Sequence, residues 1–252
     1  MHDQRSQCSM FHVKHSRDSL GLSPAAVVDA LRSARVTVTQ AQAELLIQHA
    51  DLVLEANQVM NLTRITSRKG VLWLHIVDSL AFLPHVEPLA GLVVDLGSGA
   101  GYPGIPLAIL GADMVLCEPV KKKAAFLEHS CAALGLQVPV QPLRAEEVVS
   151  VVSGSADVVV ARAVSVTASL LELAAPLLRT GGRLIALKGI PSEEELAGAR
   201  RAEPLCGMAE SARVGYALPT GERRTVLVFE KIGKPRRPLP RRPGAAQREP
   251  LG

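Results

Sequence analysis

From Ser23 to about residue 86 the chain alternates apolar and polar residues with the period of an α-helix. A first helix is predicted for SPAAVVDALRSA, because Ser23 suits the N-cap and a proline follows in the first turn. A longer helix is predicted for TQAQAELLIQHADLVLEANQVMNLT, which begins near Thr39. A third is predicted for KGVLWLHIVDSLAFLPHV, with its end at Pro84 or His85. The pattern therefore predicts a helical N-terminal appendage over residues 21–90.

The sequence pattern changes at Leu92, where short runs of β-branched residues begin to alternate with stretches that have helical periodicity. The predicted strands are LVVDLG, MVLCEP, VPVQPLR, DVVVAR and RLIALKG. The helices predicted around them are PGIPLAIL, KKKAAFLEHSCAALG, AEEVVSVV, SVTASLLELAAPLL and SEEELAGARR. Such alternation is typical of βαβ units with helices on both faces of a mostly parallel sheet. ARVGYALP and ERRTVLVFEKI add an antiparallel hairpin, so we expect a seven-stranded α/β, Rossmann-like domain over residues 91–232.

The two ends of the chain have a different composition. Residues 1–20 are polar and lack any period, so they predict a disordered extension without a secretory signal. Residues 233–252 are rich in proline, glycine and arginine, and predict a disordered basic tail. This tail holds six basic residues against one glutamate, whereas the whole chain has a net charge of +4. The body is therefore close to neutral, and any attraction to RNA must come from local clusters.

The remaining composition excludes several classes of protein. The four cysteines are scattered, with no C-x-x-C pair and no cluster at metal-ligand spacing, so neither disulfides nor a metal site is expected. The longest charge-free run, residues 96–112, is interrupted by glycine and proline, which argues against a membrane span. No heptad pattern or long apolar edge indicates a dimer. We expect a cytoplasmic monomer with no metal and no membrane contact.

The segment VVDLGSGAGYPGIP contains a literal G-x-G-x-x-G at Gly99, Gly101 and Gly104, which is typical of dinucleotide sites. The preceding strand, however, already ends at Gly97, two residues before that match begins. With the register set by the strand, the pattern is D-x-G-x-G-x-G, formed by Asp95, Gly97, Gly99 and Gly101. This arrangement is typical of S-adenosylmethionine sites, in which the loop passes under the ribose and the amino acid.

The second predicted strand ends at Glu118, about twenty residues past the glycine loop, where a carboxylate accepts both ribose hydroxyls of a nucleoside. The alternative is a tight turn in which Asp95 only caps the following helix. The combination of the loop with Glu118 and the sheet pattern favours the cofactor site.

Seven short stretches occur in the order seen in one bacterial family: NLT, HIVDSL, VVDLGSGAGYPGIPLAI, KKKAAFLEH, RAEE, VVVARAV and LKG. Over roughly residues 45–231 the chain resembles the glucose-inhibited division protein B family, which methylates N7 of a guanine in 16S rRNA. The resemblance implies a Rossmann-like S-adenosylmethionine-dependent methyltransferase with S-adenosylhomocysteine as product, and 16S rRNA or the small ribosomal subunit as partner.

The resemblance also implies site residues. The family's cofactor contacts fall on Gly97, Tyr102, Ala145, Glu146 and Arg162, and its second-strand acid falls on Glu118. The chain departs from the family pattern at Leu74, where an arginine is usual, and at Ala56 and Met60, where aromatic residues are usual. These departures concern the RNA contacts and leave the cofactor site intact.

The reaction implied by the resemblance needs alignment more than proton transfer. Methyl transfer from a sulfonium is an in-line displacement, and guanine N7 has an in-plane lone pair and no proton to remove. The chain has ARAVS where amine methyltransferases carry an N-P-P-Y type segment, and no cysteine near the fourth or fifth strand. We therefore predict no catalytic residue. Because N7 is hidden in A-form RNA, the target base is expected to be unpaired or extruded.

Several charged residues are candidates for substrate contacts. Arg162 and Lys188 end the fourth and fifth strands, at the edge where the cofactor is expected; the alternative is that both are simply solvated. His75 and Asp78 share a helix face, either as a packing pair or to position RNA. Further RNA affinity is expected from the basic tail and from Arg64, Arg68, Lys69 and Lys121–Lys123.

Two other functions remain open at this point. The literal G-x-G-x-x-G keeps a nicotinamide-dependent oxidoreductase as an alternative. The second alternative is a non-catalytic RNA-binding assembly factor with a vestigial pocket.

Overall fold

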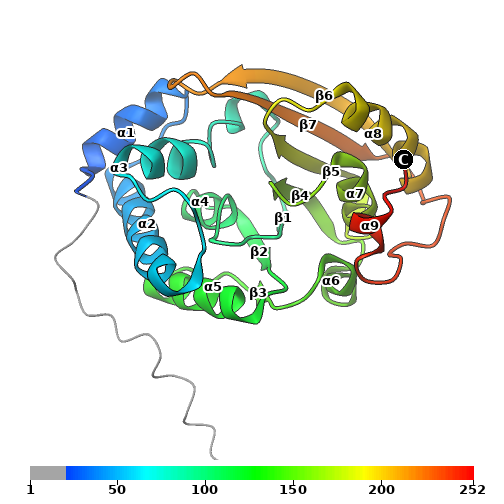
Figure 1. The fold of residues 1–252 in the computed structure, drawn as a ribbon, viewed down its shortest axis with the longest axis horizontal. Helices are drawn as coiled ribbons and strands as arrows, with labels where there is room; N and C mark the ends of the chain where they lie inside the picture. Colours follow the sequence, from blue (N-terminus) through cyan, green and yellow to red (C-terminus); the bar gives the residue numbers. More distant parts are fainter. Residues whose placement is uncertain (1–20) are drawn as a thin grey trace, which may run out of the picture.

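The computed structural model describes residues 21–252, and one twisted seven-stranded sheet runs through it (Figure 1). The strands are β1 (Leu92–Leu96), β2 (Asp113–Cys117), β3 (Val140–Gln141), β4 (Ala156–Arg162), β5 (Leu178–Lys188), β6 (Met208–Ala217) and β7 (Arg223–Lys231). Their order is β3-β2-β1-β4-β5-β7-β6, in which β7 pairs antiparallel to both neighbours and the other pairs are parallel. The predicted α/β, Rossmann-like fold is confirmed. The extension predicted for residues 1–20 lies outside the described residues.

Two layers of helices cover the sheet, and each layer forms its own apolar core with one face (Figure 1). The first layer consists of α1 (Pro24–Ser33), α2 (Gln40–Met60), α3 (Arg68–Gly70), the π-helical η1 (Val71–Val77), the 3-10 turn η2 (Leu83–His85), α4 (Gly104–Ile109) and α5 (Lys121–Ala133). The second consists of α6 (Ala145–Val152), α7 (Thr167–Ala174), α8 (Glu193–Cys206) and α9 (Ala245–Arg248). Burial on both faces explains why the central strands are continuous runs of valine and leucine. Within residues 21–252, no helix has the length and apolarity that a membrane crossing requires.

The first two helices begin where the sequence predicts. The Ser23 hydroxyl accepts a hydrogen bond from the backbone N–H of Ala26 at 3.1 Å, which satisfies an N–H that the helix leaves unpaired. Thr39 and Gln42 form a reciprocal capping box, with N–H donors at 3.2 Å and 2.9 Å. The third predicted helix is instead a wide π-helical turn between short turns. The helices pack into the same core as β1 and α4, so this region shares its interior with the sheet.

One predicted helix ends earlier than its apolar pattern indicates. The stretch SVTASLLELAAPLL forms α7 only up to Ala174, because Leu178 already pairs with Ala156 of β4. The pairing then resumes at Arg183, so the intervening residues bulge out of the ladder around Gly181, whose φ is 78°.

The prediction of a disordered tail over residues 233–252 is wrong. The segment folds against α7, where Arg241 donates from Nε and Nη2 to the carboxylate of Glu172 at 2.6 Å and 2.7 Å. The Ser169 hydroxyl donates to the carbonyl of Ala246 at 2.6 Å, and the side chain of Leu251 is buried. The prediction of disorder considered only the amino acids within the segment. The segment is ordered because the rest of the chain supplies an apolar face and a buried carboxylate for it to bind.

Candidate cofactor and RNA site

The glycine loop follows β1 at the carboxyl edge of the sheet. The strand order reverses here, because the chain continues from β1 to β2 on one side and from β4 to β5 on the other. The backbone N–H groups of Gly97 and Ser98 both donate to the carbonyl of Cys117, at 2.9 Å and 3.0 Å. Gly97 has a φ of 72°, and a Cβ there would lie 2.8 Å from Cγ2 of Val164. The sequence therefore needs bare backbone at this turn, and the turn is tied to the end of β2.

The third glycine of the literal G-x-G-x-x-G serves packing. A Cβ on Gly104 would lie 2.3 Å from Cδ2 of Leu116 and 2.5 Å from Oδ2 of Asp95, so α4 approaches the sheet closely only because Gly104 has no side chain. The third glycine of a dinucleotide motif has the same packing role, so Gly104 does not distinguish the two classes of cofactor.

Asp95 lies beneath this loop and is 1% exposed. Its Oδ2 accepts a hydrogen bond from the N–H of Gly104 at 3.1 Å, so the carboxylate caps α4. Burial raises the pKa of Asp95 to about 6, against the hydrogen bonds from Ser98 and Gly104, which lower it. The structure therefore supports the alternative interpretation of Asp95, in which its carboxylate caps a helix. A direct cofactor contact by Asp95 stays a prediction.

Glu118 follows β2 and is 5% exposed. Its Oε2 accepts from the N–H of Gly99 at 3.0 Å, and its Oε1 accepts from the N–H of Val120 at 2.9 Å. These bonds fix the carboxylate against the glycine loop, and each oxygen keeps a lone pair for another donor. A fixed carboxylate with two remaining acceptors matches the pair of hydroxyls on a ribose.

A cavity of about 90 Å³ lies between the ends of β1 and β2 and the first turn of α6, and Cys117 and Pro119, the two chain neighbours of Glu118, line it. Its lining includes Gly97, Cys117, Ala145, Glu146, Val164 and Gln247. The structure thus brings three of the predicted cofactor contacts, Gly97, Ala145 and Glu146, to one cavity. Because pockets for whole ligands measure roughly 300 Å³ or more, this cavity encloses one group, such as a nucleobase. The cradle of bare backbone, the carboxylate and the base-sized cavity together fit an adenine nucleoside.

Tyr102 and Arg162, the other two contacts implied by the resemblance, face a second cluster of side chains. The Tyr102 ring stacks on His75 with centroids 4.7 Å apart and contacts His49 at 4.6 Å, and the Arg162 guanidinium lies 5.5 Å from its centroid. Burial lowers the pKa of His49 to about 3 and that of His75 to about 4. Both imidazoles are neutral near pH 7, and their rings hold Tyr102 in place.

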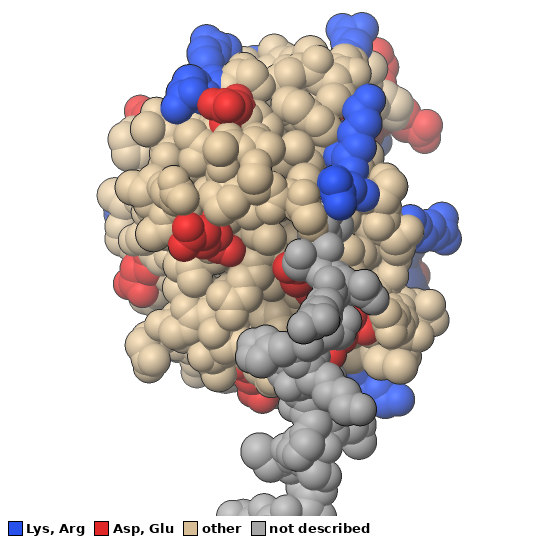
Figure 2. Space-filling model, turned by 90° about the vertical axis from the view of Figure 1, so that its left-hand side faces the viewer, with Lys and Arg blue, Asp and Glu red and all other residues tan. Residues whose placement is uncertain are grey.

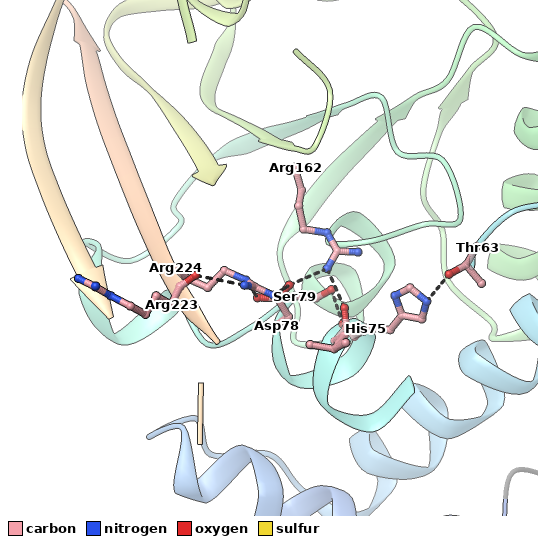
Figure 3. Close-up of polar contacts among 8 residues, drawn as sticks. Thr63, His75, Asp78, Ser79, Arg162, Arg223 and Arg224 are labelled. Carbon is pink, nitrogen blue, oxygen red and sulfur yellow. Dashed lines mark hydrogen bonds and ion pairs between the residues drawn. The ribbon is translucent and has the colours of Figure 1, made fainter. Parts of the chain in front are cut away.

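Asp78 connects this cluster to strand β7 (Figure 3). Arg224 of β7 donates from Nε and Nη2 to its two carboxylate oxygens at 2.8 Å and 3.2 Å, and Nη1 of Arg162 lies 3.5 Å from Oδ2. Nη1 of Arg162 also donates to the carbonyl of Leu74 at 3.3 Å, while His75 bonds the hydroxyl of Thr63 at 2.8 Å. Two guanidinium groups share one carboxylate, so the cluster has surplus positive charge.

Arg162 is consequently anchored and only 18% exposed, so the interpretation of a simply solvated side chain is wrong. Sequence reasoning missed Arg224, which lies 146 positions from Asp78, and His49, whose place on an amphipathic helix carries no signal of a ring contact.

Lys188 has a different environment from the one predicted. Its Nζ forms an ion pair with Glu195 of α8 at 2.7 Å and donates to the carbonyl of Ser165, so its charge is already matched. Contact with RNA by Lys188 stays a prediction. Outside the part that grey atoms cover, Figure 2 shows the face of α1 and α2 with scattered Lys and Arg side chains and no continuous basic patch.

The strand order, the glycine loop and the second-strand carboxylate define the class of Rossmann-like S-adenosylmethionine-dependent methyltransferases. One solved structure with this fold, described by its role in converting a disulfide bond into a thioacetal group during echinomycin biosynthesis, is 16% identical with a TM-score of 0.50. It covers 60% of this chain and 80% of its own, and the likeness concerns the fold alone.

A family model described as rRNA small subunit methyltransferase G matches residues 42–222. The ribosomal RNA small subunit methyltransferase G of Pelotomaculum thermopropionicum is 36% identical over 89% of this chain and 97% of its own length. The Deinococcus radiodurans protein of the same name is 39% identical over 79% of this chain and 82% of its own. The chain belongs to the rRNA small subunit methyltransferase G family, which confirms the resemblance found in the sequence.

Proposed function

We propose that this protein transfers a methyl group from S-adenosylmethionine to N7 of a guanine in 16S rRNA, free or within the small ribosomal subunit. The observation that carries the proposal is Glu118, a buried carboxylate held by the N–H of Gly99 and flanked in the chain by Cys117 and Pro119, which line a base-sized cavity. Family membership supports rRNA as the substrate, and the guanine N7 position follows from the family resemblance.

The cofactor supplies a methyl group activated on sulfur, and the chain's own residues bind and orient it. The backbone of Gly97 and Gly99 would lie under the nucleoside, and Glu118 would accept the ribose hydroxyls. Ala145 and Glu146 would flank the base in the cavity at the first turn of α6. No residue is assigned as a general base, because N7 has no proton to lose.

Orientation of the RNA is the remaining task. The cluster of Arg162, Arg224 and Asp78 has one carboxylate for two guanidinium groups, and its surplus charge would attract a phosphate near an extruded guanine. Two neutral imidazoles hold the loop beside it, so cofactor and RNA would meet at one edge of the sheet.

Calorimetric titration with S-adenosylhomocysteine tests the cofactor half of the proposal. We expect the wild type to bind, and Glu118→Gln to bind about tenfold or more weakly, because each charge-assisted hydrogen bond contributes about 1.5–3 kcal/mol. Glu128→Gln, at an exposed position on α5, is the matched control and should bind like the wild type. Circular dichroism confirms that both variants fold. Binding of NADH without any response to S-adenosylhomocysteine would instead establish the oxidoreductase.

Chemical scission at N7-methylguanine tests the substrate half. 16S rRNA from cells that lack the protein should resist scission at one guanine, and wild-type protein with S-adenosylmethionine should restore it. Unchanged scission in the deletion strain contradicts guanine N7 as the target. If Glu118→Gln restores ribosome function without binding the cofactor, the protein is an assembly factor.

A further inference from the structure

The C-terminal segment, defined as residues 233–252, contributes one residue to the cavity assigned to the cofactor. In Figure 1 its helix α9 lies beside α7, on the face of the sheet that also carries α6. Gln247 of α9 is one of the residues that line the cavity, and the other lining residues all fall between Leu96 and Leu173. The part of the cavity wall that Gln247 forms therefore comes from a segment far from the glycine loop in the sequence.

The contacts that hold this wall flank Gln247 on both sides. The N–H of Gly244 donates to Oε1 of Glu146 at 2.6 Å, so a predicted cofactor contact already anchors the segment. Arg241 binds both oxygens of Glu172, whose side chain is almost fully buried, and Ala246 is buried beside Ser169. A buried carboxylate needs its cation, so the segment is held firmly in place.

The side chain of Gln247 is exposed and makes no hydrogen bond within residues 21–252. A primary amide offers a donor and an acceptor side by side, and this pair matches the N6–H and N7 edge of adenine. Most of the remaining lining is apolar, and Glu146 has one oxygen committed to Gly244. An unpaired amide at the rim of a base-sized cavity is suited to read the edge of the base.

We propose that the C-terminal segment completes the cofactor site and that Gln247 is a specificity residue for its adenine. The inference rests on the proposed use of S-adenosylmethionine. The amide of Gln247 accepts from N6–H and donates to N7. Hypoxanthine has acceptors at both positions, so the amide satisfies only one of them, whichever way it is turned.

The test is calorimetric titration of the full-length chain with S-adenosylhomocysteine and with S-inosylhomocysteine. We expect the wild type to prefer the adenine ligand, and Gln247→Ala to bind it about tenfold more weakly, the sum of two neutral hydrogen bonds. The variant should lose at most about threefold in affinity for the inosine ligand, because it removes only one hydrogen bond there, so the preference for adenine should collapse. Gln137→Ala, an exposed glutamine in the loop before β3, is the control and should change neither affinity.

A second variant separates completion of the site from blockage. Arg241→Ala removes the anchor at Glu172, and we expect it to lower both the affinity for S-adenosylhomocysteine and the preference for adenine. A rise in affinity in either variant would show that the segment competes with the cofactor, and unchanged affinity in Gln247→Ala would remove Gln247 from the site. Either result overturns this inference. If the wild type still binds S-adenosylhomocysteine, the proposed function is unaffected. Absence of wild-type binding overturns both.

Discussion

Replacing Asp95 by asparagine should make the protein more stable at neutral pH. The carboxyl is buried under the glycine loop and its pKa is raised to about 6, whereas an unperturbed aspartate has a pKa of 3.8. Between these two pH values the folded protein keeps a proton that the unfolded chain releases, so stability falls as the pH rises. A difference of this size corresponds to about 3 kcal/mol once the pH exceeds 6, since one pKa unit is about 1.4 kcal/mol. Asparagine keeps an oxygen for the N–H of Gly104 and does not titrate.

The assay is urea unfolding followed by circular dichroism, from about pH 4 to about pH 7.5. The free energy of unfolding of Asp95→Asn minus that of the wild type should increase by about 2.5 kcal/mol over this range. Asp157→Asn is the control, because hydrogen bonds from Arg179 and from the N–H of Leu92 lower the pKa of Asp157 below its usual value. That carboxyl is ionised in the folded protein over the range and already mostly ionised in the unfolded chain at pH 4, so its difference should fall by less than about 0.5 kcal/mol as the pH rises. A pH-independent difference for Asp95→Asn, or one that falls with pH, would refute the reasoning.

Two further substitutions test the packing and charge around the site, each by the free energy of unfolding in urea. Gly104→Ala should cost about 2 kcal/mol, because the new Cβ overlaps Leu116, whereas Gly215→Ala, in open space on β6, should be nearly neutral; equal effects would contradict the close approach of α4. Asp78→Ala should cost about 3 kcal/mol, because it leaves two half-buried guanidinium groups unpaired. The control Glu87→Ala, with a side chain 83% exposed, should cost less than about 0.5 kcal/mol, and a similar loss in both would refute the assigned role of Asp78.

Local signals predicted most of the fold. The caps at Ser23 and Thr39 follow from side chains that bond backbone groups a few residues away, and such bonds do not depend on the rest of the chain. The strands follow from continuous β-branched runs, which a sheet covered on both faces requires. Of the proposed cofactor site, the glycine loop and Glu118 were predictable because their positions relative to a strand are fixed by the βαβ unit.

What the sequence did not predict depends on contacts between distant segments. The C-terminal segment is ordered through Glu172, which lies 69 positions from Arg241, and its composition alone indicated disorder. The wide turn of η1 has no period of its own that distinguishes it from an α-helix. The ring contact of His49 with Tyr102 joins α2 to the loop after β1, and a single histidine on an apolar helix face carries no signal of its partner.

The rings of His49, Tyr102 and His75 have a consequence for exchanging parts between relatives. Two of these rings come from the N-terminal helices and one from the loop after β1, and the ring of Tyr102 contacts both histidine rings. A chimaera that takes the N-terminal helices from another member of the family must therefore keep all three rings as a matched set. Otherwise the new helices will not pack against the loop after β1.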